Sequence, residues 1–548
     1  MSLPIDDIRR LSDLHPKPQG ISYQYGTAGF RTLGKVLDSV LFRVGVLAAL
    51  RSKKLDGKTI GVMVTASHNP EPDNGVKLVD PRGEMLETSW ESHATVLANT
   101  SSTDEFISAL QDFIKTTDID ISKPAKVVYA RDTRPSGPAL VAALEDGLKA
   151  TGAEGRNAGV TTTPILHYLV RTINTKGTKQ SYGVDTEEGY YTKLSSAFNK
   201  LVGRPPRPPL VIDCANGVGA LAARGLSRYL VNSLPVQLEN TAIDTPGALN
   251  NSCGADFVKV NQKLPPSLTD VLHPGQRACS LDGDADRLIY FYLDERSQFH
   301  LLDGDKITTV VASFIVELVK AVGLDERLKV GVVQTAYANG NSTKYLSERL
   351  PVKCVPTGVK HLHHAAEKYD IGVYFEANGH GTVVFSQPAQ DLIFSHQPST
   401  PTQSTALVHL QNVLNVINQT VGDALSDMLL VEAVLAHKSY GGAEWDSLYT
   451  DLPNRLVKVV VPDRNIFKTE DAERRLVRPG GLQTKIDELV NVYTGGRSFV
   501  RPSGTEDVVR VYAEAASRPQ ADELAFRVAG LVYDLAGGDP SQRPKEFL

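Results

Sequence analysis

Residues 278–293 of the chain read ACSLDGDADRLIYFYL. Two short apolar runs, 278–281 and 288–293, flank an acidic loop, which predicts two buried strands with Asp282, Asp284 and Asp286 between them. In extended backbone these three carboxylates share one face. Like charges so close repel each other unless a cation neutralises them, and hard oxygen ligands select Mg²⁺ or Ca²⁺.

This loop does not match a calcium EF-hand. That motif needs Gly at its sixth position and Glu at its twelfth, where this chain has Arg287 and Leu293. We therefore expect Mg²⁺ at the loop. The alternative is a solvated acidic turn without a metal, which the apolar runs on both sides disfavour.

The same order of apolar run, polar loop and helix-like segment recurs along the chain. Its repetition predicts an α/β fold built from several units in place of one continuous sheet. The predicted strands are 60–66, 126–130, 210–214, 329–333 and 371–376, and the predicted helices are 138–150, 303–322 and 361–368.

The chain length of 548 residues predicts about three or four domains. A smaller last domain is expected to begin with a strand at 456–461 and to end with a helix at 519–535, after a helical linker around 425–440. The polar, Pro-bearing stretch 386–405 is predicted to be a mobile surface loop without chemistry.

Composition and charge exclude several classes of protein. The net charge of −5 gives no basic field for a nucleic acid. Cys214, Cys253, Cys279 and Cys354 show no CxxC spacing, so neither a disulfide framework nor a thiolate zinc site is predicted. No targeting signal is visible at the N-terminus, and no stretch reaches the ~18 apolar residues of a membrane span. We expect a soluble cytoplasmic protein without a membrane partner.

The segment Thr65-Ala66-Ser67-His68-Asn69-Pro70 displays a hydroxyl where a predicted strand meets a tight turn. Loops at strand ends are where α/β proteins keep their sites. The flanking residues do not form a G-x-S-x-G nucleophile elbow, and adjacent Ser67 and His68 are not expected to point at each other. We expect an exposed Ser67 hydroxyl to act as the nucleophile, although a plain turn is the simpler reading of this segment alone.

Two further loops suit a phosphorylated sugar. The segment 501–506, RPSGTE, lies between two predicted strands, and Arg510 follows on the second. Its Gly, hydroxyl and Arg groups suit a phosphate monoester. The segment 376–381, EANGHG, begins at the last residue of the predicted strand 371–376 and offers acceptors and amides to sugar hydroxyls.

The order TASHNP, DGDADR, EANGHG, RPSGTE resembles the α-D-phosphohexomutase superfamily, and YGTAGFR at 25–31 is similar to that superfamily's N-terminal loop. The early serine and the EAN motif look like its eukaryotic phosphoacetylglucosamine mutase branch. The resemblance implies three related α/β domains plus a smaller C-terminal α+β domain around a central cleft. The implied domains are 1–185 with the serine loop, 186–299 with the metal loop, 300–445 with the sugar loop and 446–548 with the phosphate loop.

The same resemblance implies an intramolecular phosphotransferase that interconverts N-acetylglucosamine 6-phosphate and N-acetylglucosamine 1-phosphate, for UDP-N-acetylglucosamine biosynthesis. It implies a phosphoserine at Ser67, a sugar 1,6-bisphosphate as activator and intermediate, and Mg²⁺ held by Ser67, Asp282, Asp284 and Asp286. The implied catalytic residues are Ser67, His68, Lys77 and Arg31. The implied substrate-binding residues are Arg287, Thr357, Gly358, Lys360, His361, Glu376, Asn378, Arg501, Ser503, Gly504, Thr505, Glu506 and Arg510.

The general acid/base is left open by the sequence. Val359 stands where many members of the superfamily have histidine, so Lys360 or His361 is the candidate, while His363 and His364 are expected to be ordinary helix residues. The alternative functions are a phosphoglucomutase or phosphomannomutase, a metal-dependent sugar phosphatase, and an inactive sugar-phosphate sensor. A phosphatase has no use for a second phosphate cradle, and a sensor should have lost Ser67 or an aspartate.

Overall fold

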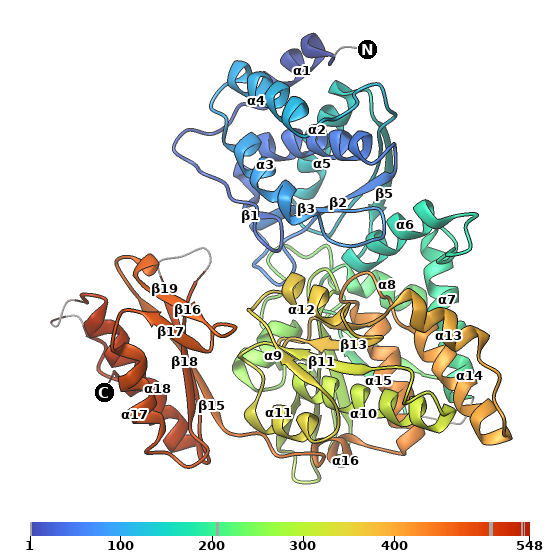
Figure 1. The fold of residues 1–548 in the computed structure, drawn as a ribbon, viewed down its shortest axis with the longest axis vertical. Coiled ribbons are helices and arrows are strands. Elements are labelled where there is room, and N and C mark those ends of the chain that lie inside the picture. Colours follow the sequence, from blue (N-terminus) through green and yellow to red (C-terminus); the bar gives the residue numbers. More distant parts are fainter. Residues whose placement is uncertain (1–2, 204–207, 504–507, 539–540, 542, 548) are drawn as a thin grey trace. The chain divides into compact units, whose positions relative to one another are not determined.

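The computed structural model describes residues 3–203, 208–503, 508–538, 541 and 543–547 (Figure 1). The chain forms two compact units. The first, which we call the serine unit, comprises Met1–Asp303, Asn378–Thr382 and Val408–Gly442. The second, which we call the phosphate-loop unit, comprises Gly304–Ala377, Val383–Leu407 and Ala443–Leu548.

The first sheet of the serine unit has the strand order β1-β3-β2-β4-β5. Its central strand β2 was predicted from the apolar run 60–66. The strand is wholly buried and runs parallel to β4. Helices α2 and α5 pack against each other beside this sheet, and α6 contacts β2. The strands are β1 Phe30–Leu33, β2 Thr59–Val64, β3 Asp73–Val79, β4 Lys126–Arg131 and β5 Glu154–Val160, and the helices are α1 Ile5–Ser12, α2 Asp38–Lys54, α3 Thr88–Asn99, α4 Thr103–Thr116, α5 Gly137–Ala150 and α6 Thr163–Thr175.

The second sheet of the serine unit has the order β10-β9-β8-β6-β7. Strands β8 and β9 are antiparallel neighbours, which confirms the prediction from residues 278–293. The elements are β6 Leu210–Asp213, β7 Val236–Glu239, β8 Arg277–Leu281, β9 Leu288–Leu293 and β10 Phe299–Leu302, with α7 Glu187–Val202, α8 Gly219–Ser227 and α9 Gly254–Asn261.

Helix α15 (Ala424–Lys438) confirms the helix predicted around 425–440, but it is not a linker. All residues from Ala424 to Leu435 are buried, and the helix packs against α7 and β9 of the serine unit. Arg277 forms an ion pair with Glu432 on this helix. A helix buried on all sides is part of a core.

The first sheet of the phosphate-loop unit has the order β12-β11-β13-β14. Its predicted strands and helices are present with small shifts at their ends. The elements are α10 Gly304–Val322, β11 Val330–Gln334, α11 Gly340–Ser347, β12 Val352–Cys354, α12 Val359–Ala366, β13 Ile371–Phe375 and β14 Gly381–Phe385.

The prediction of a mobile loop at 386–405 is wrong. The stretch begins helix α13 (Gln387–Ser395) and then helix α14 (Pro401–Val416). Ser386 caps α13 by accepting from the Ala389 N–H at 3.2 Å, and Pro388 occupies its first turn. Ser before a helix and Pro in its first turn are start signals, so these polar residues open helices.

The last sheet has the order β15-β19-β18, and β16 and β17 form a separate hairpin. Helix α18 confirms the helix predicted at 519–535. The elements are α16 Gly442–Asp446, β15 Asn454–Val460, β16 Lys468–Glu470, β17 Arg475–Arg478, α17 Leu482–Val490, β18 Arg497–Pro502, β19 Val508–Glu514 and α18 Arg518–Leu535.

The four cysteines are free, as predicted. Among the described residues, no helix combines the length and the apolar character that crossing a bilayer demands.

Candidate functional site

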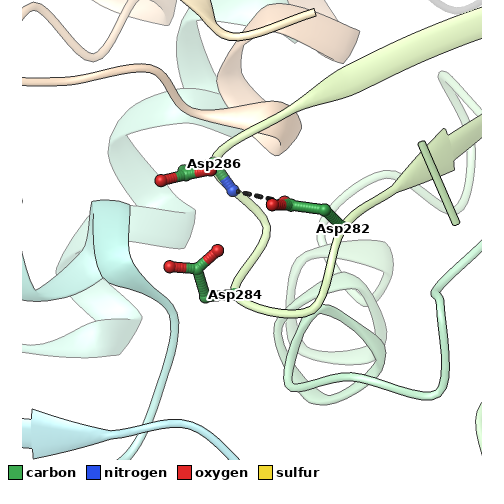
Figure 2. A group of neighbouring side chains, drawn as sticks. All are labelled: Asp282, Asp284 and Asp286. Carbon is green, nitrogen blue, oxygen red and sulfur yellow. Dashed lines mark hydrogen bonds between the residues drawn. The ribbon is translucent and has the colours of Figure 1, made fainter. Parts of the chain in front are cut away.

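Three of the four predicted metal ligands are aspartates that lie together in the serine unit. Asp282, Asp284 and Asp286 come from the loop between β8 and β9, and one carboxylate oxygen of each lies within 4.8 Å of the others (Figure 2). All three are buried. The Asp286 N–H donates to Asp282 Oδ1 at 3.0 Å, which holds the loop closed.

The donor set fits a hard divalent cation. Asp284 Oδ1 is buried and has no hydrogen-bond partner among the described residues, which is costly unless an ion takes that place. Burial, Asp286 and Asp284 raise the pKa of Asp282 well above its ordinary value. A cation would lower the repulsion that these charges create.

Positive side chains face the cluster. Lys77 on β3 places Nζ 3.3 Å from Asp286 Oδ2 and 3.5 Å from Asp284 Oδ2. Burial alone would raise the pKa of Asp286, but His380 and Lys77 lower it well below its ordinary value. Arg287 is more distant, with Nε 3.9 Å from Asp282 Oδ2.

Ser67 contacts the acidic loop directly. Its hydroxyl donates to Asp282 Oδ2 at 2.6 Å, and its backbone φ of +53° lies in the left-handed region. The predicted exposure of this hydroxyl is wrong, because Ser67 is only 1% exposed. The partner that covers it lies 215 positions away in the chain, so the local pattern could not reveal the burial.

His68 lies closer to the serine hydroxyl than predicted. Its Nδ1 is 3.5 Å from Ser67 Oγ, a contact longer than an ordinary hydrogen bond. Burial, Arg287 and Arg31 lower the pKa of His68 to about 2. The imidazole is therefore neutral at physiological pH and adds no charge to the site.

Arg31 reaches the same loop from β1. Its Nη1 donates to Asn69 Oδ1 at 3.2 Å, two residues after Ser67. Burial and the neighbouring Arg287 lower its pKa, although it stays charged. The structure thus brings together every catalytic residue that the sequence predicted.

Two contacts to the aspartates were missed by the sequence. Thr163 donates from Oγ1 to Asp284 Oδ2 at 2.6 Å. His380 places Nδ1 3.4 Å from Asp286 Oδ1. The EANGHG motif contains His380 and could have drawn attention to it, whereas no local signal marks Thr163, 121 positions from its partner.

A tight turn places His380 on the acidic loop. Asn378 Oδ1 accepts from the His380 N–H at 3.0 Å. Between them Gly379 has a φ of +84°, and a Cβ there would lie 2.0 Å from the Leu288 carbonyl oxygen. Only glycine fits at that position. The predicted sugar-binding Glu376 follows β13, two residues before Asn378.

The phosphate-loop unit holds the remaining predicted residues. Arg501 on β18 donates from Nε to Glu473 Oε1 at 2.8 Å, and Arg510 on β19 is its register partner. Ser503 donates its N–H to the Val508 carbonyl at 2.8 Å. The predicted residues Gly504, Thr505 and Glu506 lie outside the described residues.

The segment Thr357 to His361 begins helix α12. Gly358 precedes the helix with a φ of +128°, Lys360 is buried and His361 is exposed. His363 is an ordinary helix residue, as predicted, because its Nδ1 lies 3.0 Å from the hydroxyl of Tyr374 inside the unit. His364 is exposed on the same helix, as predicted.

Known proteins match this chain over nearly its whole length. Its sequence matches the family profiles phosphoacetylglucosamine mutase AMG1, domain II (residues 180–289) and domain III (303–440). It also matches two phosphoglucomutase/phosphomannomutase profiles, alpha/beta/alpha domain I (45–105 and 94–180) and the C-terminal domain (456–531).

Individual relatives agree with the profiles. The phosphoacetylglucosamine mutase of Homo sapiens is 52% identical over 539 residues, 97% of each chain. The crystal structure of Aspergillus fumigatus N-acetylphosphoglucosamine mutase in complex with GlcNAc-6P and magnesium superposes with a TM-score of 0.94 at 52% identity, covering 98% of this chain and 100% of that one. A structure of the A. fumigatus protein in complex with glucose 1,6-bisphosphate also gives 0.94 at 52% identity, covering 98% and 99%. This chain belongs to the phosphoacetylglucosamine mutase family of the α-D-phosphohexomutase superfamily.

Proposed function

We propose that the chain interconverts N-acetylglucosamine 6-phosphate and N-acetylglucosamine 1-phosphate through a phosphoserine at Ser67 and a sugar 1,6-bisphosphate. The observation that carries the proposal is the 2.6 Å contact between Ser67 Oγ and Asp282 in a buried cluster of three carboxylates. The A. fumigatus relatives in complex with GlcNAc-6P and magnesium and with glucose 1,6-bisphosphate support it. The product would supply the synthesis of UDP-N-acetylglucosamine.

The proposed reaction moves one phosphoryl group at a time. The Ser67 Oγ–P bond breaks as a sugar hydroxyl oxygen bonds to phosphorus, and the hydroxyl proton passes to a base on the protein. The sugar bisphosphate reverses its orientation, its other phosphoryl group bonds to Ser67 Oγ, and the freed sugar oxygen regains a proton. Positioning and charge supply most of the catalysis in such transfers.

The residues of the serine unit have distinct roles in this proposal. Phosphorylated Ser67, Asp282, Asp284 and Asp286 would hold Mg²⁺, which offsets negative charge on the transferred group. Lys77 and Arg31 add positive charge, while His68 stays neutral and can accept a hydrogen bond.

Further residues supply binding groups in the proposal. We assign the phosphate that does not react to Arg501, Ser503 and Arg510, whose charge-assisted hydrogen bonds suit a monoester. We assign the sugar hydroxyls and acetamide to Glu376 and Asn378. The remaining proposed substrate contacts are Thr357, Gly358, Lys360, His361, Arg287, Gly504, Thr505 and Glu506.

The same proposal includes four domains, with the boundaries 1–185, 186–299, 300–445 and 446–548. It also includes a cytoplasmic location and no nucleic-acid partner.

Intact mass spectrometry with glucose 1,6-bisphosphate tests the proposed phosphoserine directly. Wild-type protein should gain one phosphoryl group, and Ser67→Ala should gain none. Ser195→Ala, which removes another buried serine hydroxyl on α7, is the matched control and should behave as wild type. Turnover of N-acetylglucosamine 6-phosphate should fall at least about 10²-fold in Ser67→Ala. Equal labelling of Ser67→Ala, or release of inorganic phosphate in place of transfer, would contradict the proposal.

A further inference from the structure

Arg134 uses all of its side-chain hydrogen-bond donors around residues 65–73, which we call the serine loop. The residue follows β4, and its side chain is fully buried. Nε donates to Asp132 Oδ2 at 3.0 Å. The other four donors reach backbone carbonyls of the serine loop: Ser67 and Asn69 at 2.8 Å each, Pro70 at 2.6 Å and Asp73 at 2.9 Å. A guanidinium has five N–H groups, so none is left over.

Asp132 fixes that guanidinium in turn. Its Oδ1 accepts from the Arg134 N–H at 3.0 Å, and its Oδ2 also accepts from the Thr65 hydroxyl at 2.7 Å. The same hydroxyl accepts from the Ser67 N–H at 3.0 Å. Both the N–H and the carbonyl of Ser67 are therefore held by one buried, connected set of bonds.

A second side chain binds the same two carbonyls. Asn250, from the loop before α9, donates through Nδ2 to the Ser67 oxygen at 3.0 Å and to the Asn69 oxygen at 3.1 Å. Each of these oxygens thus accepts from Arg134 and from Asn250, which uses both lone pairs of a carbonyl. Two segments far apart in the chain converge on the carbonyl of the serine.

The bonds to the carbonyl have a local consequence at Ser67. A left-handed backbone is strained at a residue other than glycine and persists only where surrounding contacts over-determine it. In this conformation Oγ lies 2.6 Å from Asp282. Releasing the carbonyl would let φ relax and would turn Oγ away from the acidic loop.

We propose that Arg134 and Asn250 are positioning residues that hold Ser67 in its left-handed conformation and aim its hydroxyl at the metal-binding carboxylates. The catalytic part of this inference rests on the proposed function, because it requires Ser67 to carry the phosphoryl group. The ordering of the loop does not depend on the reaction.

Arg51 provides a matched control for Arg134. It is also a buried arginine of the serine unit, and its Nε and Nη2 donate to Asp80 at 2.8 and 2.7 Å. Its Nη2 also donates to Glu87 at 3.0 Å, so these partners lie outside residues 65–73. Lysine has only three donors, so Arg134→Lys must lose at least two of the five bonds. Arg51→Lys disturbs another buried ion pair of the same unit.

The experiment compares Arg134→Lys, Asn250→Leu and Arg51→Lys with the wild-type full chain, well below each melting temperature. Two readouts are taken: kcat and KM for N-acetylglucosamine 6-phosphate, and amide hydrogen exchange of residues 65–73. We expect Arg134→Lys to lower kcat about 10- to 100-fold, the scale of a misplaced reacting group, with KM changed less than about threefold. Exchange of the loop should accelerate at least tenfold. Asn250→Leu should show the same pattern more weakly, and Arg51→Lys should lower only the melting temperature.

The two readouts separate failure of this inference from failure of the proposed function. If Arg134→Lys does not fold, Asn250→Leu decides, because it removes two donors from the same carbonyls. The positioning role is overturned if the loop of Arg134→Lys exchanges as slowly as that of wild type. It is also overturned if kcat of Arg134→Lys falls no more than kcat of Arg51→Lys. If wild type shows no phosphoserine and no turnover, the proposed function fails, and loop exchange alone then decides whether these residues order the loop.

Discussion

The guanidinium of Arg501 donates from Nε to Glu473 Oε1 over 2.8 Å, within the phosphate-loop unit. The other carboxylate oxygen of Glu473 accepts from both the N–H and the hydroxyl of Thr357, at 2.9 and 2.6 Å. Although burial lowers the pKa of Arg501, Glu473 raises it above its ordinary value. One carboxylate therefore links the proposed phosphate-binding arginine to the loop that precedes α12.

Glu473→Gln should strengthen binding of sugar phosphates. Glutamine keeps one acceptor oxygen, which can serve either Arg501 or Thr357 but not both. It also removes the negative charge with which an incoming phosphate must compete. We expect KM for both phosphate isomers to fall severalfold. Arg501→Ala is the opposite control and should weaken both isomers by about 1.5–3 kcal/mol, the scale of a charged hydrogen bond. An unchanged or higher KM in Glu473→Gln would show that its charge does not oppose phosphate, and a loss in Arg501→Ala confined to one isomer would contradict binding in two orientations.

Asp284→Asn should change activity and stability in opposite directions. The variant loses one of the anionic ligands proposed for Mg²⁺, so turnover should fall at least about 10²-fold, as should turnover of wild type in EDTA. The metal-free variant should melt a few degrees higher than metal-free wild type, because one of three buried like charges is gone. Thermal melts in EDTA and activity titrations with Mg²⁺ measure both effects. Full activity of the wild-type enzyme in EDTA would show that the reaction does not need a metal.

Asn378→Ser should shift sugar preference. A serine hydroxyl can replace the turn bond to the His380 N–H, although more weakly, but it lacks the amide donors that suit an acetamide. We expect kcat/KM to shift about tenfold from N-acetylglucosamine phosphate toward glucose phosphate, about 1.4 kcal/mol of differential transition-state binding. Both substrates are measured in parallel. If the two values fall equally, Asn378 only shapes the turn.

His15 should make stability depend on pH. Its Nδ1 lies 2.8 Å from Asp38 and its Nε2 lies 3.3 Å from Asp146, and the hydrogen bond to Asp38 raises its pKa although burial lowers it. A raised folded-state pKa stabilises the fold fully below the unfolded value of about 6.5, and this contribution is lost as pH rises through the folded value. The melting temperature of wild type should exceed that of His15→Gln most at low pH. A difference that grows as pH rises would contradict this linkage.

The strands were predictable because their signal is local. An apolar run such as 288–293 can be recognised from its own residues, and β9 occupies the predicted range. The helices at 387–416 were missed because abundant Ser, Pro and Gln suggested a loop, although Ser386 and Pro388 are start signals for α13. Composition was a poorer guide there than the position of single residues.

The sequence predicted the site residues that lie together in one motif. It did not predict the contacts that join residues far apart in the chain. The acidic loop contains all three aspartates, whereas the bond from Ser67 to Asp282 spans 215 positions and that from Thr357 to Glu473 spans 116. Nothing local marks Arg134 or Glu473 as partners of these loops. Burial of Ser67 likewise follows from contacts that only the folded chain creates.

The placement of α15 has a consequence for how the protein is made. The helix lies in the last segment of the serine unit, Val408–Gly442. The ribosome therefore makes it long after Asp303, once much of the phosphate-loop unit has been synthesised. At translation speeds of about 5–20 residues per second, the nascent serine unit waits on the order of ten seconds for this helix. Until then Arg277 lacks Glu432 and Tyr190 lacks Asp423, its partner at 2.8 Å. A nascent chain that stops at Asp303 should therefore bind chaperones and be sensitive to proteases, whereas one extended to Gly442 can close its core cotranslationally.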